Sequence, residues 1–367
     1  MTGAPASPDP LRAGVAARID RAAADLLPAY FALVMATGIV SLAAWVQGFA
    51  TLAHAMFWVN VGFFAALWAL TLLRAARHWK RLRADVFSHA RGVGFFTAVP
   101  AACVLGTQAL LILRAPAVAW GLWIAGATLW ALVSYTVFAA LTVKAEKPPL
   151  EQGFNSGWLV SVVATQSVSV LASQLAGGAG VTPDAAQSLL FIALTAWLQG
   201  AMLYVWIISL IFYRYTFLAF KPSDLSPPYW INMGAMAIST LAGASLVLAS
   251  RGSGAGLVSE VLPFIKGATL LFWATATWWI PMLLILGVWR HVLKRVPLRY
   301  DPLYWGAVFP LGMYSVATVR MGEALGVSFL SPVARAFFWA GLLAWGMALA
   351  GLARRMVMPV RETIGGT

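Results

Sequence analysis

Residues 28–45 read PAYFALVMATGIVSLAAW, a run of 18 residues without a charged side chain. A helix needs about 20 mostly apolar residues to cross the hydrocarbon core of a bilayer. Similar runs recur along the whole chain of 367 residues, in which 61% of the residues are hydrophobic and 10% are charged. Too few charged groups are present to cover the surface of soluble domains of this length. The sequence therefore predicts an all-α membrane protein.

Uncharged blocks of this kind predict ten transmembrane helices, none of which contains Asp, Glu, Lys, Arg or His. The predicted spans are residues 28–47, 55–73, 93–112, 117–142, 157–176, 186–213, 231–250, 267–289, 303–319 and 336–353. They define a transmembrane domain over residues 28–353, between an N-terminal tail (1–27) and a C-terminal tail (354–367). Because the loops are short, we expect the helices to pair as five helical hairpins.

The basic residues indicate the orientation of these spans. Of the 25 Lys and Arg residues, 20 lie in the two tails and in the loops after spans 2, 4, 6 and 8. This asymmetry predicts that both tails are cytoplasmic and that the protein is a multi-pass protein of the inner (plasma) membrane. The net charge of +13 is therefore explained by topology and by contact with anionic membrane lipid, and no nucleic-acid partner is expected.

Odd-numbered and even-numbered spans differ in composition. Thirteen of the 18 Trp residues lie in even spans, where large amphipathic rings suit lipid contact and the membrane interface. Small hydroxyl and amide side chains favour the odd spans and suit close packing or contact with water. We therefore expect five odd helices to surround a central pore and five even helices to enclose them. The polar bias is equally compatible with hydrogen bonding between packed helices.

Two groups of small polar residues are candidates for the lining of the pore. Thr37 and Ser41 share one face of the first span, next to Gly38, which permits close approach of another backbone or a solute. The fifth span carries hydroxyls at four-residue spacing, at Ser161, Thr165, Ser169 and Ser173. The alternative is that these residues serve helix packing or bond to carbonyls of their own helix.

Two prolines interrupt odd spans, Pro100 in span 3 and Pro310 in span 9. A proline inside a helix removes a backbone hydrogen bond, so we expect each helix to kink, with Pro100 in the pore lining and Pro310 next to the gate as part of it. Phe309 directly precedes Pro310 and lies about 9 Å inside its span at 1.5 Å per residue. An aromatic ring at that depth is a candidate gate that excludes water from a narrow passage. Packing against a neighbouring helix is the alternative role for this ring.

The spans contain no HExxH motif, cysteine pair, histidine cluster or carboxylate pair. No catalytic residue, metal site or cofactor is therefore expected, and the protein is not expected to be an enzyme. A proton relay also lacks ionisable groups in the spans. The single cysteine, Cys103, is expected to be a small buried side chain. A solute in the pore would meet a neutral lining, and basic loops at the cytoplasmic mouth would attract anions.

Three segments resemble the tellurite-resistance/dicarboxylate transporter family: FALVMATGIVS (31–41), WWIPMLLILGVWRH (278–291) and YDPLYWGAVFPLGMYSVAT (300–318). This family includes the slow-type anion channels of plant guard cells, yeast malate permeases and fungal sulfite pumps. The resemblance implies five hairpins around a pseudo-five-fold axis, a pore through each subunit, a homotrimer, and a pore-blocking Phe at the position of Phe309.

Taken together, the sequence predicts passage of small anions through a neutral, aromatic-gated pore. The alternative is an alternating-access carrier or exporter of four-carbon dicarboxylates, sulfite or tellurium oxyanions. A non-transporting membrane scaffold or sensor is a third possibility, which predicts no anion flux. The residues do not identify the anion.

Overall fold

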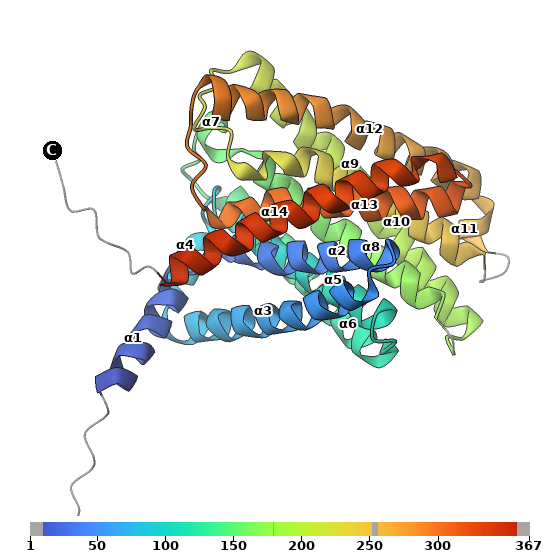
Figure 1. Ribbon diagram of the computed structural model, residues 1–367, viewed down its shortest axis with the longest axis horizontal. Helices are drawn as coiled ribbons and strands as arrows, with labels where there is room; N and C mark the ends of the chain where they lie inside the picture. The colour runs from blue at the N-terminus through green and yellow to red at the C-terminus, as the bar shows by residue number, and fades with distance from the viewer. Residues whose placement is uncertain (1–9, 179, 252–255, 358–367) are drawn as a thin grey trace, which may run out of the picture.

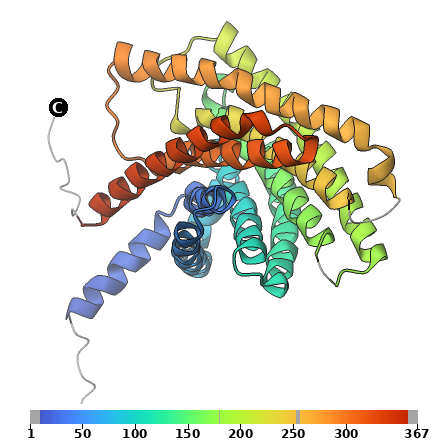
Figure 2. The ribbon, with the colours of Figure 1, turned by 45° about the vertical axis from the view of Figure 1, so that its right-hand side comes forward.

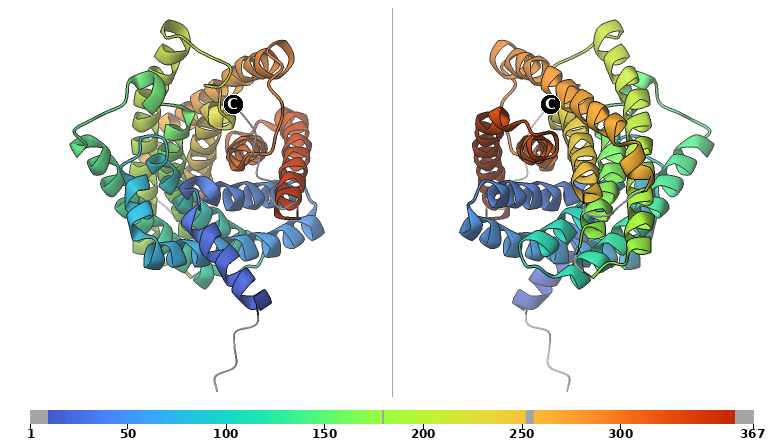
Figure 3. Two further views of the ribbon diagram at one scale, coloured as in Figure 1. Left: turned by 90° about the vertical axis from the view of Figure 1, so that its left-hand side faces the viewer. Right: turned by 90° about the vertical axis from the view of Figure 1, so that its right-hand side faces the viewer.

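The computed structural model describes residues 10–178, 180–251 and 256–357, and every regular element within these ranges is helical (Figure 1). Five helices form an inner ring: α2 (Ala32–Val46), α5 (Ala98–Leu111), α8 (Val160–Ala176), α10 (Ile231–Ser250) and α13 (Trp305–Leu325). Five longer helices enclose them: α3 (Ala50–Arg77), α6 (Pro116–Val143), α9 (Pro183–Phe217), α12 (Leu262–Val288) and α14 (Ser331–Val357). Shorter helices are α1 (Pro10–Ala24), α4 (Trp79–Val86), α7 (Leu150–Gly153) and α11 (Leu257–Glu260). Figure 3 views the helices from the two ends of the bundle.

Burial separates the two rings. In the spans that contain α2, α5, α8 and α10, 78–94% of the most apolar 18 residues are buried. The corresponding values for α3, α6, α9, α12 and α14 are 17–39%. The prediction of inner odd helices and outer even helices is therefore confirmed.

Nine helices in the described part of the chain are long and apolar enough to cross a membrane, and α13 is not among them. Helix α13 packs against α2, α10 and α14, and 14 of its 21 residues are buried. Because most of its surface is covered by other helices, α13 tolerates more polar residues than an outer helix. With α13, the ring of five hairpins is complete.

Every inner helix begins with a 3-10 turn that leads directly into the α-helix. These turns are Pro28–Phe31, Gly92–Thr97, Ser156–Leu159, Pro227–Trp230 and Pro302–Tyr304. Three of them start with proline, whose fixed φ suits the first position of a helix and whose missing N–H is not needed there. The repeated start indicates that the five hairpins are variants of one unit.

A repeated hydrogen bond joins the two rings. In each case a side-chain N–H of an outer helix donates to the inner helix that follows it around the ring. The donor and acceptor pairs are Asn60 to Gln108 Oε1 (2.7 Å), Trp130 to Thr165 Oγ1 (2.8 Å), Trp197 to the Ser239 carbonyl (2.9 Å), Trp273 to Thr318 Oγ1 (3.0 Å) and Trp345 to Thr37 Oγ1 (3.0 Å). Thus four tryptophans of the outer helices anchor their N–H groups inside the bundle, whereas Trp58, Trp206, Trp278 and Trp339 are exposed on its outer surface, as expected for lipid contact.

Part of the predicted N-terminal tail is structured. Helix α1 packs against α3 and projects from the end of the bundle at which α14 finishes (Figure 1). Asp20 forms an ion pair with Arg77 (3.4 Å), and Asp25 pairs with Arg81 (2.8 Å). These pairs are largely exposed, so each contributes little to stability on its own.

Candidate functional site

All five inner helices contribute to one small central cavity. Its volume is about 20 Å³, enough for about one water molecule. The lining residues are Ile39, Leu42, Cys103, Val104, Thr107, Ser167, Val170, Ile238, Leu241 and Met313. Thr107, Ser167 and Cys103 are the lining residues that carry a polar group, and the Ser167 hydroxyl donates to the Ala164 carbonyl of its own helix at 2.7 Å. None of the lining residues is of an ionised type at neutral pH. The cavity is therefore neutral and mostly apolar.

Phe309 lies four residues before Met313 on α13, so both residues share one face of the helix. Side chains on a helix lean toward its N-terminus, which places the Phe309 ring on the N-terminal side of the cavity. Phe309 is 1% exposed. Phe309 is therefore buried in the inner ring, but it is not among the residues that line the cavity, where α13 contributes Met313.

Pro310 fixes α13 against α10. A Cβ atom added to Gly234 of α10 would lie 2.6 Å from Pro310 Cγ, closer than carbon atoms can approach. The missing side chain of Gly234 is therefore what allows the two helices to pack closely at the level of Phe309. Pro310 lies inside α13, as predicted from the sequence.

Pro100 differs from its predicted role in the helix. It occupies the third position of α5, directly after the 3-10 turn Gly92–Thr97, and not the helix interior. The missing N–H of Pro100 therefore lies close to the junction of the 3-10 turn and the α-helix, and not in the middle of a regular α-helix. Pro100 precedes Val104 by four residues and Thr107 by seven. Because Val104 and Thr107 line the cavity, Pro100 lies on the same face of α5 as these lining residues.

The hydroxyls of Thr37 and Ser41 bond to outer helices. Thr37 accepts the indole N–H of Trp345, and Ser41 donates to the carbonyl of Ala53 on α3 at 2.8 Å. Gly38 lies between them at a close contact, where an added Cβ would meet Val104 Cγ1 at 2.5 Å. None of these three residues belongs to the cavity lining.

The stripe of hydroxyls on α8 is arranged in the same way. Thr165 accepts a hydrogen bond from Trp130 of α6 and donates to the Ser161 carbonyl (2.9 Å). Ser169 donates to the carbonyl of Ala193 on α9 at 2.7 Å. Ser167, which lies outside the four-residue stripe, is the α8 hydroxyl that borders the cavity. Ser161 and Ser173 donate instead to the carbonyls of Trp158 and Ser169 in their own helical segment. In this structure the hydroxyls chosen from the sequence therefore connect helices or bond to their own helix, and the lining is provided by their neighbours.

Periodicity within the sequence could have found two of the missed residues. Met313 follows Phe309 by four residues and Thr107 follows Pro100 by seven, so each shares a helix face with a residue already singled out. Helix α13 continues to Leu325 and not to residue 319 as predicted, so it also includes Arg320. Arg320 lies seven residues beyond Met313, on the same face, and pairs with Glu323 at 2.8 Å.

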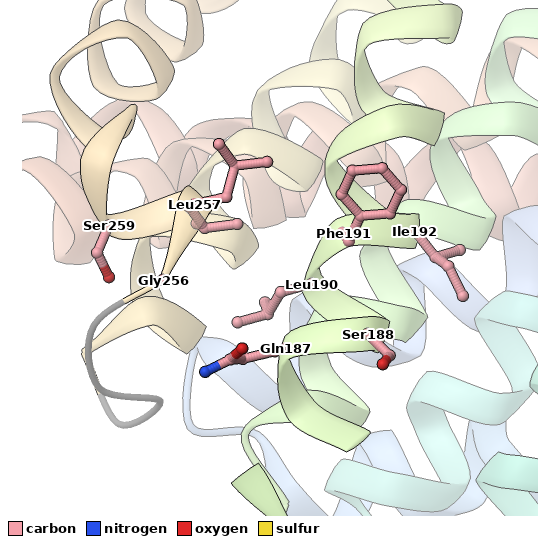
Figure 4. Close-up of a pocket in the computed structure, with 9 residues that line it drawn as sticks. Gln187, Ser188, Leu190, Phe191, Ile192, Gly256, Leu257 and Ser259 are labelled. Atoms are coloured by element: carbon pink, nitrogen blue, oxygen red, sulfur yellow. The ribbon is translucent and has the colours of Figure 1, made fainter. Parts of the chain in front are cut away.

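A separate pocket of about 500 Å³ lies on the outer surface between the start of α9 and α11. Leu190 and Phe191 of α9 and Leu257 of α11 are among its lining residues (Figure 4). None of its lining residues comes from the inner ring, so this pocket is not part of a central pathway.

Comparison with known proteins relates almost the whole membrane region to one family. The family model described as voltage-dependent anion channel matches residues 25–353. An uncharacterized membrane protein of Mycobacterium tuberculosis is 37% identical over 158 residues, which are 43% of this chain and 79% of that protein. Two uncharacterized transporters of Methanocaldococcus jannaschii are each 23% identical, over 325 and 335 residues. These alignments cover 87% and 89% of this chain and 92% of each relative.

Proposed function

The chain belongs to the voltage-dependent anion channel family, and from this membership we propose that it passes small anions through the centre of its inner helical ring. The single observation that carries the proposal is the central cavity, to which all five inner helices contribute and which contains no ionised group. A neutral and mostly apolar lining does not bind a passing anion too strongly for it to leave.

The direction of the inner helices supports anions as the cargo. Because one outer helix separates each inner helix from the next, all five inner helices run in the same direction. Their N-terminal ends, which carry partial positive charge, therefore lie at the same end of the bundle as the basic loops. The combined field of the helix ends and of these Lys and Arg residues raises the local concentration of anions and lowers that of cations.

Phe309 is the gate in this proposal. Its buried ring lies on the N-terminal side of a cavity of about 20 Å³, so movement of the ring would be required before a chloride or a larger anion could pass. Pro310 and Gly234 hold the backbone of α13 next to the ring in a fixed position. Opening therefore requires a new rotamer of Phe309 or a shift of α13 relative to α10.

An alternating-access carrier or exporter is the second candidate, and the names of the two relatives from M. jannaschii, which are called transporters, favour it. Its substrates would be four-carbon dicarboxylates, sulfite or tellurium oxyanions. A dicarboxylate of four carbons is too large for a cavity of about 20 Å³, so a carrier of this kind would have to separate its inner helices to admit the substrate.

Flux measurements in liposomes test the proposal and separate the two candidates. The purified protein is reconstituted, and uptake of chloride, nitrate, sulfite, malate and tellurite is measured with and without a pH gradient. We expect passive anion flux that does not saturate at millimolar concentrations. Saturation with counterflow of labelled malate would assign the carrier, and absence of flux for every anion would contradict both candidates and favour a scaffold or sensor.

Assembly and orientation complete the proposal. We place both termini in the cytoplasm and the protein in the plasma membrane as a homotrimer, with one pathway in each subunit. The mass of the complex in detergent tests the trimer. Cysteines introduced at residues 5 and 364 into a Cys103→Ser chain test the orientation, because both should react with impermeant reagents only after the membrane is opened.

A further inference from the structure

A large groove lies at the end of the bundle at which α12 finishes and α13 begins. Its volume is about 840 Å³, and its walls come from the starts of α10 and α13 and the ends of α12 and α14. Figure 2 shows α12 diverging from α13 and α14 toward this end. Helix α12 contains Pro281 and continues into a π-helical turn, Trp289–Leu293, and both features disturb regular helix geometry.

The rim of the groove is strongly basic. Arg290, Arg299, Arg354 and Arg355 border it together with His291, and no Asp or Glu is among its lining residues. Within the described residues, none of the four arginines forms an ion pair with a carboxylate. Guanidinium groups without a carboxylate partner are suited to an anionic ligand with several oxygen atoms.

The floor of the groove is apolar. It is formed by Ala307, Val308 and Leu311 of α13 and by Ala344, Met347 and Ala348 of α14. The three alanines have short side chains, and the larger rings of Tyr300 and Tyr304 also line the groove. Gly351 allows the ring of Tyr300 to pack directly on α14, since an added Cβ would meet that ring at 2.6 Å.

A basic rim above an apolar floor indicates the chemistry of the ligand. A free inorganic anion would use the arginines only and would leave most of a groove of about 840 Å³ empty. An anionic amphiphile can contact both the arginines of the rim and the apolar floor. We propose that this groove binds one anionic phospholipid, with the headgroup phosphate at the arginines and an acyl chain along α13 and α14.

Because of the position of the groove, a bound lipid can influence the helix that carries the proposed gate. Val308 and Leu311 line the groove and directly flank Phe309 and Pro310 in the sequence. A lipid in the groove therefore contacts the outer face of the helix that carries the proposed gate on its inner face. This consequence rests on the proposed function, whereas lipid binding itself is independent of it.

Native mass spectrometry of the full-length protein tests the site without a transport assay. The delipidated protein in detergent is titrated with dioleoyl phosphatidylglycerol, with dioleoyl phosphatidylethanolamine and, in a third series, with inorganic phosphate as competitor. We expect phosphatidylglycerol to be retained preferentially. The double variant Arg290→Gln/Arg354→Gln should weaken retention by about tenfold or more, since each basic residue near an anionic lipid contributes about 1 kcal/mol.

Two further variants separate the site from general charge and from misfolding. Lys80→Gln/Arg83→Gln removes the same charge from α4, away from the groove, and should retain phosphatidylglycerol like the unmodified protein. Ala344→Phe fills the apolar floor without changing charge and should weaken retention of the lipid.

Equal retention of the two lipids, or equal loss in the groove and α4 variants, would overturn the proposal. Full displacement by millimolar phosphate would assign the groove to a free anion. Loss of the oligomer in the groove variant would assign it to a subunit interface.

Discussion

The indole N–H of Trp345 donates to the hydroxyl of Thr37 at 3.0 Å, although 308 residues separate the two in the chain. This bond links the last outer helix, α14, to the first inner helix, α2. Because each of the other four outer helices forms a comparable bond to the next inner helix, the contact between Trp345 and Thr37 closes the ring. A closed ring is what keeps five separate helices around one central cavity.

Removing this bond should loosen the ring. Trp345→Phe keeps an aromatic ring but deletes the N–H donor, and hydrogen bonds between helices in membranes are worth about 0.6 kcal/mol on average. We expect a small fall in the thermal unfolding temperature in detergent. Trp339→Phe on the same helix is the control, because Trp339 is 50% exposed. Equal unfolding temperatures for the two variants would argue against the closing role of the bond.

Gly234→Ala should disturb the contact between α10 and α13 next to Phe309. The new methyl group would lie 2.6 Å from Pro310 Cγ, so α13 must move away from α10. We expect a loss of stability of about 1–3 kcal/mol, as for other overpacked sites, and a higher basal anion flux as Phe309 is displaced. Gly267→Ala on α12 is the control, because no atom lies within 4 Å of its added Cβ. If the two variants have the same flux, the contact between Gly234 and Pro310 does not set the position of the gate.

Cys103 can report directly on access to the cavity. It is the single cysteine of the chain, it is buried, and it belongs to the cavity lining. Methyl methanethiosulfonate should modify the unaltered protein slowly and the Phe309→Ala variant at least several-fold faster, as measured by mass spectrometry. Cys103→Ser provides the background. An unchanged modification rate would mean that the ring of Phe309 does not restrict access to the cavity.

Arg320 should attract anions at the end of the pathway opposite the basic loops. It lies about 10 Å beyond Met313 along the same face of α13, and its side chain is 26% exposed. Arg320→Gln should lower anion flux several-fold at low ionic strength and by less at high salt, because salt screens exposed charges. Arg335→Gln, an exposed residue near the start of α14, is the control. A salt-independent effect, or the same effect in both variants, would contradict this role.

The architecture could be predicted from the sequence because lipid contact and burial select different residues. Outer helices must be apolar on most of their surface, whereas inner helices can carry hydroxyls and amides, and that difference is visible in composition alone. The outward orientation of Thr165 and Ser169 could not be predicted in the same way. A four-residue spacing identifies one helix face, but it does not say whether that face meets the pore or the next helix.

The ends of the helices also cannot be predicted from composition alone. A span predicted from uncharged residues alone ends at the first charged residue, which for span 9 means before Arg320. Helix α13 continues because one side of its last turns, at Met321 and Ala324, is buried and because Arg320 pairs with Glu323. The same reasoning explains why buried Arg74 and Arg214 lie in the last turns of α3 and α9, beyond the predicted ends of their spans.

The central claim is that anions pass through the inner ring and that the ring of Phe309 closes this pathway. Chloride flux into liposomes is therefore compared for the unaltered protein, Phe309→Ala and Phe338→Ala. Phe338 is the matched control, because it is equally buried but lies on the outer helix α14, where it stacks on Phe49. The account predicts that Phe309→Ala raises the flux several-fold and that Phe338→Ala does not. Flux through Phe309→Ala equal to that of the unaltered protein would contradict it.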